Sequence, residues 1–200
     1  MTKRWQWCIS AALFSGIFLS VAYYIIPRWL DLRQREKVAW AFAKALEQQD
    51  FKEAVKWIMK TEQDLGVNPQ VIASAFEVLK LPRMNLIGVK SVGRIDFQAD
   101  VRSFWTVEGG KKSVRVMLIL QKEGKEWRIN FFFTFRRFCW LRLYLNGMDP
   151  IEAFYRAERE AGRILGQLGV KGYVSPVGTV REMGAVRGWI TPEGWKEKKE

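Results

Sequence analysis

The side chains that could carry out catalysis are few in this chain of 200 residues. There is no histidine, which excludes Ser/His and Cys/His nucleophile pairs as well as histidine-ligated zinc. Of the two cysteines, Cys8 lies in an apolar amino-terminal segment and Cys139 lies between Phe138 and Trp140. A lone cysteine among aromatic residues is most often a buried small hydrophobe. We therefore predict no disulfide framework, no metal site and no cofactor.

Two carboxylates are the remaining candidates for acid–base chemistry. Asp96 and Asp100 fall in a segment where apolar and polar residues alternate, as is typical of a strand with one buried face. Both belong to the polar set, so we expect them on the solvent side. A buried general base would need a cavity and a shifted pKa. The pattern favours solvated charges, with a carboxylate-dependent enzyme as the alternative.

Positive charge is the strongest signal in the composition. The formal net charge is +12 at pH 7, from 33 Lys and Arg against 21 Asp and Glu, and most of the excess lies between residues 111 and 148. A basic surface attracts anionic partners such as phospholipid headgroups, nucleic acid or cell-wall polymers, although it also keeps a protein soluble. The predicted patch for an anionic partner consists of Arg115, Arg128, Arg136, Arg137 and Arg142.

Nucleic acid is disfavoured as that partner. Sheets that bind single strands place exposed aromatic rings between basic residues, and Phe132 and Trp140 are the candidates here. However, residues 131–135 are more simply explained as a strand covered on both faces, without a ribonucleoprotein pattern or a Gly-rich phosphate loop. A position close to the membrane explains the segment Arg136–Arg142 better. A basic module for membrane surfaces or nucleic acid stays an alternative.

The amino-terminal segment predicts a membrane anchor. No charged residue occurs from Trp5 to Pro27, and a helix of that length would extend roughly 34 Å, enough to cross the hydrocarbon core of a bilayer. Aromatic rings favour the headgroup layer, and they mark both ends of this segment as Trp5, Trp7, Tyr23, Tyr24 and Trp29. We predict an uncleaved signal anchor over residues 1–29, with the amino terminus in the cytoplasm and the domain outside.

A cleaved secretory signal is the alternative to this anchor. Ser20 and Ala22 place small residues at alternate positions, which suits a signal peptidase. The apolar run continues past Ala22 to Ile26, which favours an anchor. Basic residues are nearly balanced across the segment, so the orientation depends on the preference of short amino-terminal tails for the cytoplasm.

Beyond the anchor, the chain is long enough for one domain. The first part of this domain is predicted to be helical. Leu30–Gln49 has apolar residues at helical spacing. Asp50 opens a capping box that starts a second helix. Asn68-Pro69 supplies a cap and a first-turn proline for a third helix, which ends before Pro82.

The period changes from helical to alternating after Met84, which predicts an antiparallel meander. A short strand over Asn85–Val92 should precede three long strands joined by glycine-containing turns. The predicted long strands are Ile95–Val107, Val114–Leu120 and Trp127–Phe135. We expect Trp105, Trp127 and Phe131 to face the helices, with Arg128 and Arg136 on the opposite face of the last strand.

The carboxyl-terminal quarter predicts one more helix and a tail. Asp149-Pro150 starts an amphipathic helix that Gly169 ends, over residues 149–169. Its apolar residues include Ile151 and Phe154. The tail over residues 170–200 is rich in glycine and charge, and we expect it to be poorly ordered.

These elements resemble the nuclear transport factor 2-like superfamily of cystatin-like α+β cones. The resemblance is carried by the segment Ala45–Ala54, by the helices after it, and by a last strand that opens Glu126-Trp127-Arg128-Ile129. In that superfamily, helices pack into the concave face of a curved antiparallel sheet. The resemblance covers roughly Asp31–Leu145 and implies such a domain over residues 30–148. The added helix and tail depart from the simplest members and leave open whether the mouth of the cone is accessible.

The same resemblance implies a function. Members with a single amino-terminal membrane helix are often non-catalytic, as in the membrane-anchored subunits of type IV secretion and conjugation machines. We therefore expect a single-pass binding or scaffold protein of a secretion or envelope complex. Its expected partners are the lipid bilayer and another envelope or membrane protein, and self-association is left open. Other relatives are lyases and isomerases that work inside the cone, so a cone-pocket enzyme that uses a carboxylate is the alternative.

Overall fold

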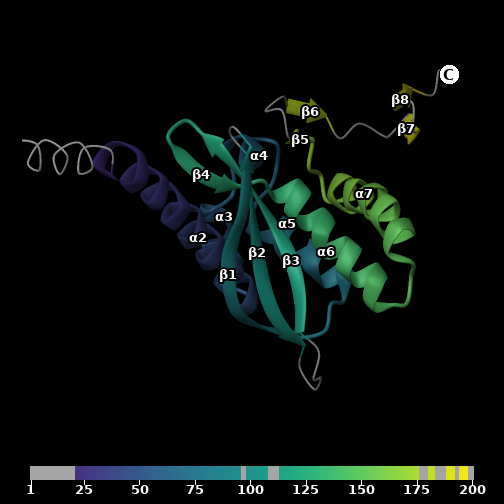
Figure 1. Ribbon diagram of the computed structural model, residues 1–200. Helices are drawn as coiled ribbons and strands as arrows, with labels where there is room; N and C mark the ends of the chain where they lie inside the picture. Colours follow the sequence, from purple (N-terminus) through teal and green to yellow (C-terminus); the bar gives the residue numbers. More distant parts are fainter. Residues whose placement is uncertain are drawn as a thin grey trace, which may run out of the picture.

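The fold is α+β in the part of the chain that the computed structural model describes, namely residues 21–95, 98–107, 113–175, 180–182, 188–191 and 194–197. A long amino-terminal helix leads into shorter helices, a four-stranded antiparallel sheet and two further helices (Figure 1). The predicted fold class is confirmed at this level.

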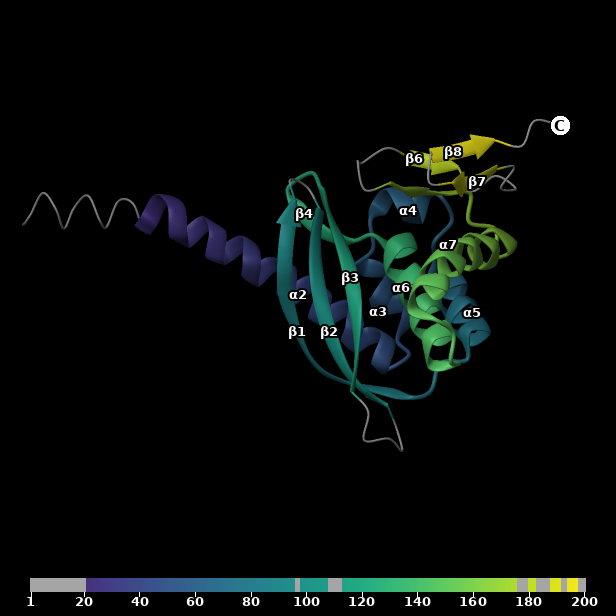
Figure 2. The same cartoon turned by 45° about the vertical axis from the view of Figure 1, so that its right-hand side comes forward.

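The long helix begins with a π-helical turn, η1 (Val21–Ile25), and continues as α2 (Ile26–Glu47). Residues 23–30 are exposed, whereas buried residues begin at Arg35. Figure 2 shows this first part of α2 projecting away from the sheet. Of the predicted anchor residues, Tyr23, Tyr24 and Trp29 are exposed here, and Trp5 and Trp7 lie outside the described residues. Within the described ranges, no helix has the length and apolar character to span a bilayer.

Two predicted helix starts are confirmed by their caps. The Asp50 carboxylate accepts a hydrogen bond from Glu53 N at 2.9 Å, at the start of α3 (Phe51–Lys56). The Asn68 side chain accepts one from Val71 N at 3.0 Å, at the start of α5 (Pro69–Leu79). Such caps satisfy N–H groups that the first turn leaves free. The sequence pattern does not predict the short helix between them, α4 (Lys60–Asp64).

The sheet has the order β1-β2-β3-β4, with all neighbours antiparallel. Its strands are β1 (Met84–Ile95), β2 (Gln98–Val107), β3 (Ser113–Glu123) and β4 (Glu126–Ile129). The predicted strand beginning at Ile95 is wrong at its start, because Ile95 ends β1 and is 78% exposed. Asp96 and Phe97, between β1 and β2, lie outside the described residues.

The last predicted strand is wrong beyond Ile129. The chain turns at Asn130 into α6 (Phe131–Leu145), and the Asn130 side chain accepts a hydrogen bond from Phe133 N at 3.2 Å. A helix cap therefore ends β4 after four residues.

The phenylalanine pattern explains the error. Phe131 and Phe135 satisfy both strand alternation and helical spacing, whereas Phe138 fits the helical spacing alone. All three are buried. Because Arg136 belongs to α6, it does not share a strand face with Arg128 as predicted.

The last long helix is α7 (Pro150–Gln167), which packs on α6 (Figure 1). Its predicted cap is confirmed, since the Asp149 carboxylate accepts hydrogen bonds from Ile151 N at 2.9 Å and Glu152 N at 3.1 Å. Gly169 follows the helix with a φ of +85°, a conformation that glycine adopts readily.

The chain then returns to the core, so the prediction of a poorly ordered tail is wrong for residues 170–175. Val170 and Val174 are buried. Tyr173 of β5 (Gly172–Val174) stacks on Phe132, with ring centroids 4.0 Å apart. The remaining strands are β6 (Val180–Glu182), which pairs with β5, and β7 (Gly188–Thr191), which pairs with β8 (Gly194–Glu197).

The core lies between the helices and the inner face of the sheet. Trp105, Trp127 and Phe131 are 2%, 1% and 0% exposed, so their predicted burial is confirmed, although Phe131 lies on α6. Trp105 meets Phe138 edge to face, with ring centroids 6.4 Å apart. Cys139 is the predicted buried hydrophobe, and burial raises the pKa of its thiol.

Candidate ligand-binding groove

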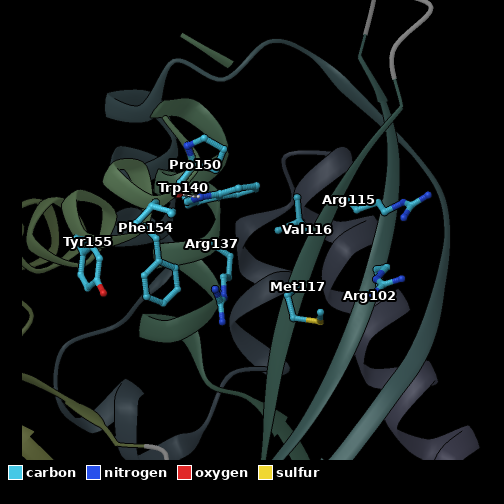
Figure 3. Close-up of a pocket in the computed structure, with 10 residues that line it drawn as sticks. Arg102, Arg115, Val116, Met117, Arg137, Trp140, Pro150, Phe154 and Tyr155 are labelled. Carbon is cyan, nitrogen blue, oxygen red and sulfur yellow. Dashed lines mark hydrogen bonds between the residues drawn. The ribbon is translucent and has the colours of Figure 1, made fainter. Parts of the chain in front are cut away.

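A groove of about 460 Å³ lies between strand β3 and the hairpin of α6 and α7 (Figure 3). Ligand pockets typically have volumes of this order. Its sheet wall includes Arg102, Arg115 and Met117, and its helical wall includes Arg137, Trp140 and Phe154. The groove thus combines positive charge with aromatic surface.

The sheet wall is formed by the outer face of β2 and β3. Arg102 pairs opposite Met117, and Phe104 pairs opposite Arg115. These side chains alternate with the buried residues of the two strands, which face the helices. The Arg115 guanidinium lies 6.0 Å from the centre of the Phe104 ring. The outer face therefore presents two cations beside apolar surface.

The helical wall is held rigid by aromatic packing. The Trp140 ring stacks on Tyr144, with centroids 5.3 Å apart and planes 4° apart, and its Nε1 donates a hydrogen bond to Pro150 O at 3.1 Å. Phe154 is 37% exposed, and the Arg137 guanidinium lies 5.5 Å from the centre of its ring. A positioned indole and a partly exposed phenyl ring offer contact area at little entropic cost.

The three groove arginines, Arg102, Arg115 and Arg137, have no ion pair or hydrogen bond to any residue that the structure describes. Burial and the neighbouring Arg136 lower the pKa of Arg137, while Asp100 exerts a weaker opposing attraction. A half-buried cation without a partner costs free energy, and a bound anion would offset that cost.

The predicted anionic-partner patch is divided by the fold. Arg136 pairs with Glu158 at 2.9 Å, and Arg142 pairs with Glu160 at 2.6 Å, both across the α6–α7 contact. Arg128 on β4 pairs with Glu126 and donates to the Lys56 carbonyl. These arginines are neutralised within the protein, in contrast to Arg115 and Arg137.

Arg102 is the groove arginine that the predicted patch omits. Its place in the polar set of an alternating strand puts it on the solvent face, and this is the signal that could have identified it. Phe154 was predicted as an apolar helix residue, yet it lines the groove because the small residues Ala153 and Ala157 fill the contact of α7 with the core.

A second cavity, of about 540 Å³, lies over Trp105 and Phe138, with Glu47 and Glu77 at its rim. Burial alone would raise the pKa of Glu47, but hydrogen bonds from Lys44 and from the Leu86 N–H outweigh it and lower that pKa. Glu47 is therefore held ionised by structural contacts.

Asp100, one of the two carboxylates considered from the sequence and expected on the solvent side, is half-exposed on the outer face of β2 and accepts a hydrogen bond from Gln98 at 3.3 Å. Over the described ranges, no group of acidic or cysteine side chains is arranged to hold a metal ion. The chain matches no known family model, and a search of curated proteins finds no significant match.

Proposed function

We propose that this protein is a single-pass membrane-anchored binding or scaffold protein that holds another protein in the groove between β3 and the α6–α7 hairpin. The observation that carries the proposal is the presence of three arginines that have no ion pair or hydrogen bond to any described residue and that lie beside aromatic surface. The titratable side chains among the described lining residues are those arginines and Tyr155, none of which is a general base at neutral pH. This composition favours binding over acid–base catalysis.

The proposed anchor is the uncharged segment Trp5–Pro27, with the domain outside the cytoplasm. The exposed apolar residues at positions 23–30 support it, because such a surface is stable in or beside a bilayer. After a carbonate wash, the chain should stay in the membrane pellet and retain its amino-terminal peptide. A released chain that starts near Tyr23 would contradict the anchor.

The resemblance to the nuclear transport factor 2-like superfamily supports a scaffold role in a secretion or envelope complex. Helices that precede the sheet and pack on its inner face agree with that layout. The early end of β4 and the start of α6 depart from it. We propose the family relationship on the first point and regard the α6–α7 hairpin as a departure from that layout.

A cone-pocket lyase or isomerase is the second candidate, and the cavity over Trp105 is the observation that favours it. Glu47 is the carboxylate to test there. The variant Glu47→Gln keeps an acceptor for the Leu86 N–H but cannot act as a base. Under the binding proposal the cellular phenotype of Glu47→Gln is that of the parent, and loss of function in the folded variant would favour the enzyme.

Photochemical crosslinking tests the binding proposal. A photoreactive phenylalanine analogue is placed at Tyr155, on the rim of the groove, in the full chain in its own cells. It should crosslink to a discrete partner protein, and Arg137→Glu should weaken the adduct. The same analogue at Trp40, which is exposed on α2 and does not line the groove, is the matched control. Equal adducts from both positions, or an adduct insensitive to Arg137→Glu, would contradict the proposal.

A further inference from the structure

One edge of the sheet opens into the groove. Strand β4 pairs with β3 from Leu120 to Glu123, whereas β3 pairs with β2 as far as Ser113. Among the described strands, β3 from Ser113 to Ile119 therefore has a neighbour on one side only. At about 3.3 Å per residue, this open edge is roughly 20 Å long.

The backbone direction at Ile119 shows which groups face the groove. Its N–H donates to Thr134 Oγ1 at 3.0 Å, and its carbonyl accepts from Asn130 N at 2.8 Å, so both groups point toward α6. Backbone groups alternate from side to side along a strand. Those of Met117 and Arg115 consequently point the same way as those of Ile119, and both residues line the groove.

We propose that this open edge of β3 accepts an extended segment of the partner protein as an additional strand, and that acidic and apolar residues alternate along that segment. Strand addition obtains affinity from main-chain hydrogen bonds and specificity from alternate side chains. The inference rests on the proposed function and deepens it, because it names the binding mode and the chemistry of the partner.

The alternation follows from the two faces of the groove. A strand beside β3 would place every second side chain on the outer face, next to Arg102 and Arg115, where carboxylates are favoured. The side chains between them would meet Val116 and the rings of Trp140 and Phe154, where apolar residues are favoured (Figure 3). This pattern also fixes the register, since a slip by one residue would exchange the two sets.

A synthetic peptide in which glutamate alternates with leucine is the probe, with the full chain in uncharged detergent micelles. Two N-methylated forms are compared. In the first, the methyl groups are on the glutamate amides, which face β3 when the segment pairs antiparallel with the glutamates outward. In the second, they are on the leucine amides, which face away from β3. The first form should bind about tenfold more weakly than the parent peptide, the effect of losing a pair of ordinary hydrogen bonds. The second form should bind like the parent.

The protein side is tested with a matched pair of variants. Met117→Pro removes an N–H that faces the groove, and proline is tolerated at a strand edge where that N–H is outside the ladder. Met117→Ala keeps the N–H and removes the side chain. Met117→Pro should weaken peptide binding severalfold more than Met117→Ala. If Met117→Pro does not fold, the methylated peptides provide the same test on the parent protein.

The outcomes separate this inference from the proposed function. Equal binding of both methylated peptides and the parent would overturn strand addition, while a specific crosslink at Tyr155 would leave the proposed function standing. Displacement of the peptide by anionic phospholipid vesicles, with no effect of methylation, would assign the arginines to lipid. Self-association of the chain that Met117→Pro abolishes would assign the edge to a second copy. Either of these results would overturn the inference.

Discussion

The two edges of the sheet differ in how their backbone groups are satisfied. On β1, the Ser91 N–H donates to Glu36 at 3.1 Å, and the Leu86 N–H donates to Glu47 at 3.0 Å. Both glutamates belong to α2, so this helix covers the edge with side-chain acceptors. Two register shifts in β1 further disfavour pairing with another strand. On β3, the stretch from Ser113 to Leu118 has no comparable protection among the described residues, whereas the Ile119 N–H donates to Thr134 Oγ1 of α6.

This difference agrees with the proposed binding of a partner segment at the open edge. Sheets generally protect their edges because an exposed one pairs with other chains. Here the protected edge has partners from α2, while the open edge lies in the groove that also contains Arg102, Arg115 and Arg137, which have no ion pair to a described residue. Over the described part of the chain, backbone groups and charges without protein partners thus occur together, as the proposed binding of an acidic extended segment requires.

The largest expected effect on stability comes from Trp127, which connects β4 at one edge of the sheet with α2, the helix that covers the other edge. It lies on β4, which covers the end of β3, and its Nε1 donates to Asp31 of α2 at 2.7 Å. Trp127→Ala should lower the free energy of unfolding by about 3–5 kcal/mol in urea denaturation. Trp127→Phe, which keeps an aromatic ring in the core, should lower the free energy of unfolding by less. A Trp127→Ala protein as stable as the parent would show that this face is not the core.

The second-largest expected effect on stability comes from Glu62, which holds the start of α6 in the helical wall of the groove. Glu62 is buried and accepts hydrogen bonds from Phe131 N at 2.5 Å and Phe132 N at 3.3 Å, at the start of α6. Burial raises its pKa from 4.5 to about 7, although these hydrogen bonds and one from the Val174 N–H oppose the shift. The folded state therefore binds more protons than the unfolded state between those pH values.

The contribution of Glu62 to stability is greatest below pH 4.5, falls as the pH rises to about 7, and is constant above that. The fall should be of the order of 3 kcal/mol. Glu62→Gln, measured by denaturation across the same range, should remove this component. Parallel pH profiles for the parent and Glu62→Gln would show that Glu62 is not the group responsible.

Opening the protected edge should have a smaller effect on stability and a visible effect on association. Replacing Glu36 and Glu47 together with alanine leaves the N–H groups of Ser91 and Leu86 without acceptors. The free energy of unfolding should fall by about 2 kcal/mol, and sedimentation should detect self-association through β1. Glu77→Ala, which changes an exposed glutamate of α5, is the control. If the double variant sediments as the parent does, the glutamates do not protect the edge.

The smallest effect is expected at Asp100, on the outer face between the two edges. Its half-exposed carboxylate accepts one long hydrogen bond, from Gln98. Asp100→Asn should change the free energy of unfolding by no more than about 0.5 kcal/mol and should leave the cellular phenotype intact. A null phenotype in a folded Asp100→Asn protein would favour a catalytic function.

The sequence predicts the features that depend on local signals. The caps at Asp50, Asn68 and Asp149 are correct because capping depends on residues within one turn. The change from strand to helix at Asn130 is missed, since both patterns fit the phenylalanines and since the buried Glu62 carboxylate reaches this helix start only in the folded chain. Non-local contacts of this kind leave no periodic pattern in the sequence.

The candidate site is predictable only in part, for a similar reason. Local charge density points to Arg115 and Arg137, which line the groove. It does not show that Arg136 meets Glu158, because that pair depends on how α6 and α7 pack. The open edge of β3 depends on where β4 ends, which is set by the helix start at Asn130.

Residue-resolved amide hydrogen exchange of the full chain in micelles tests the central claim most directly. In the free protein, the amides of Arg115 and Met117 should exchange much faster than those of Leu86 and Ser91, which have side-chain acceptors. Adding the alternating glutamate–leucine peptide should slow exchange at Arg115 and Met117 and leave Leu86 and Ser91 unchanged. Slow exchange at Arg115 and Met117 without peptide, or no change when the peptide is bound, would contradict an open edge that accepts a strand.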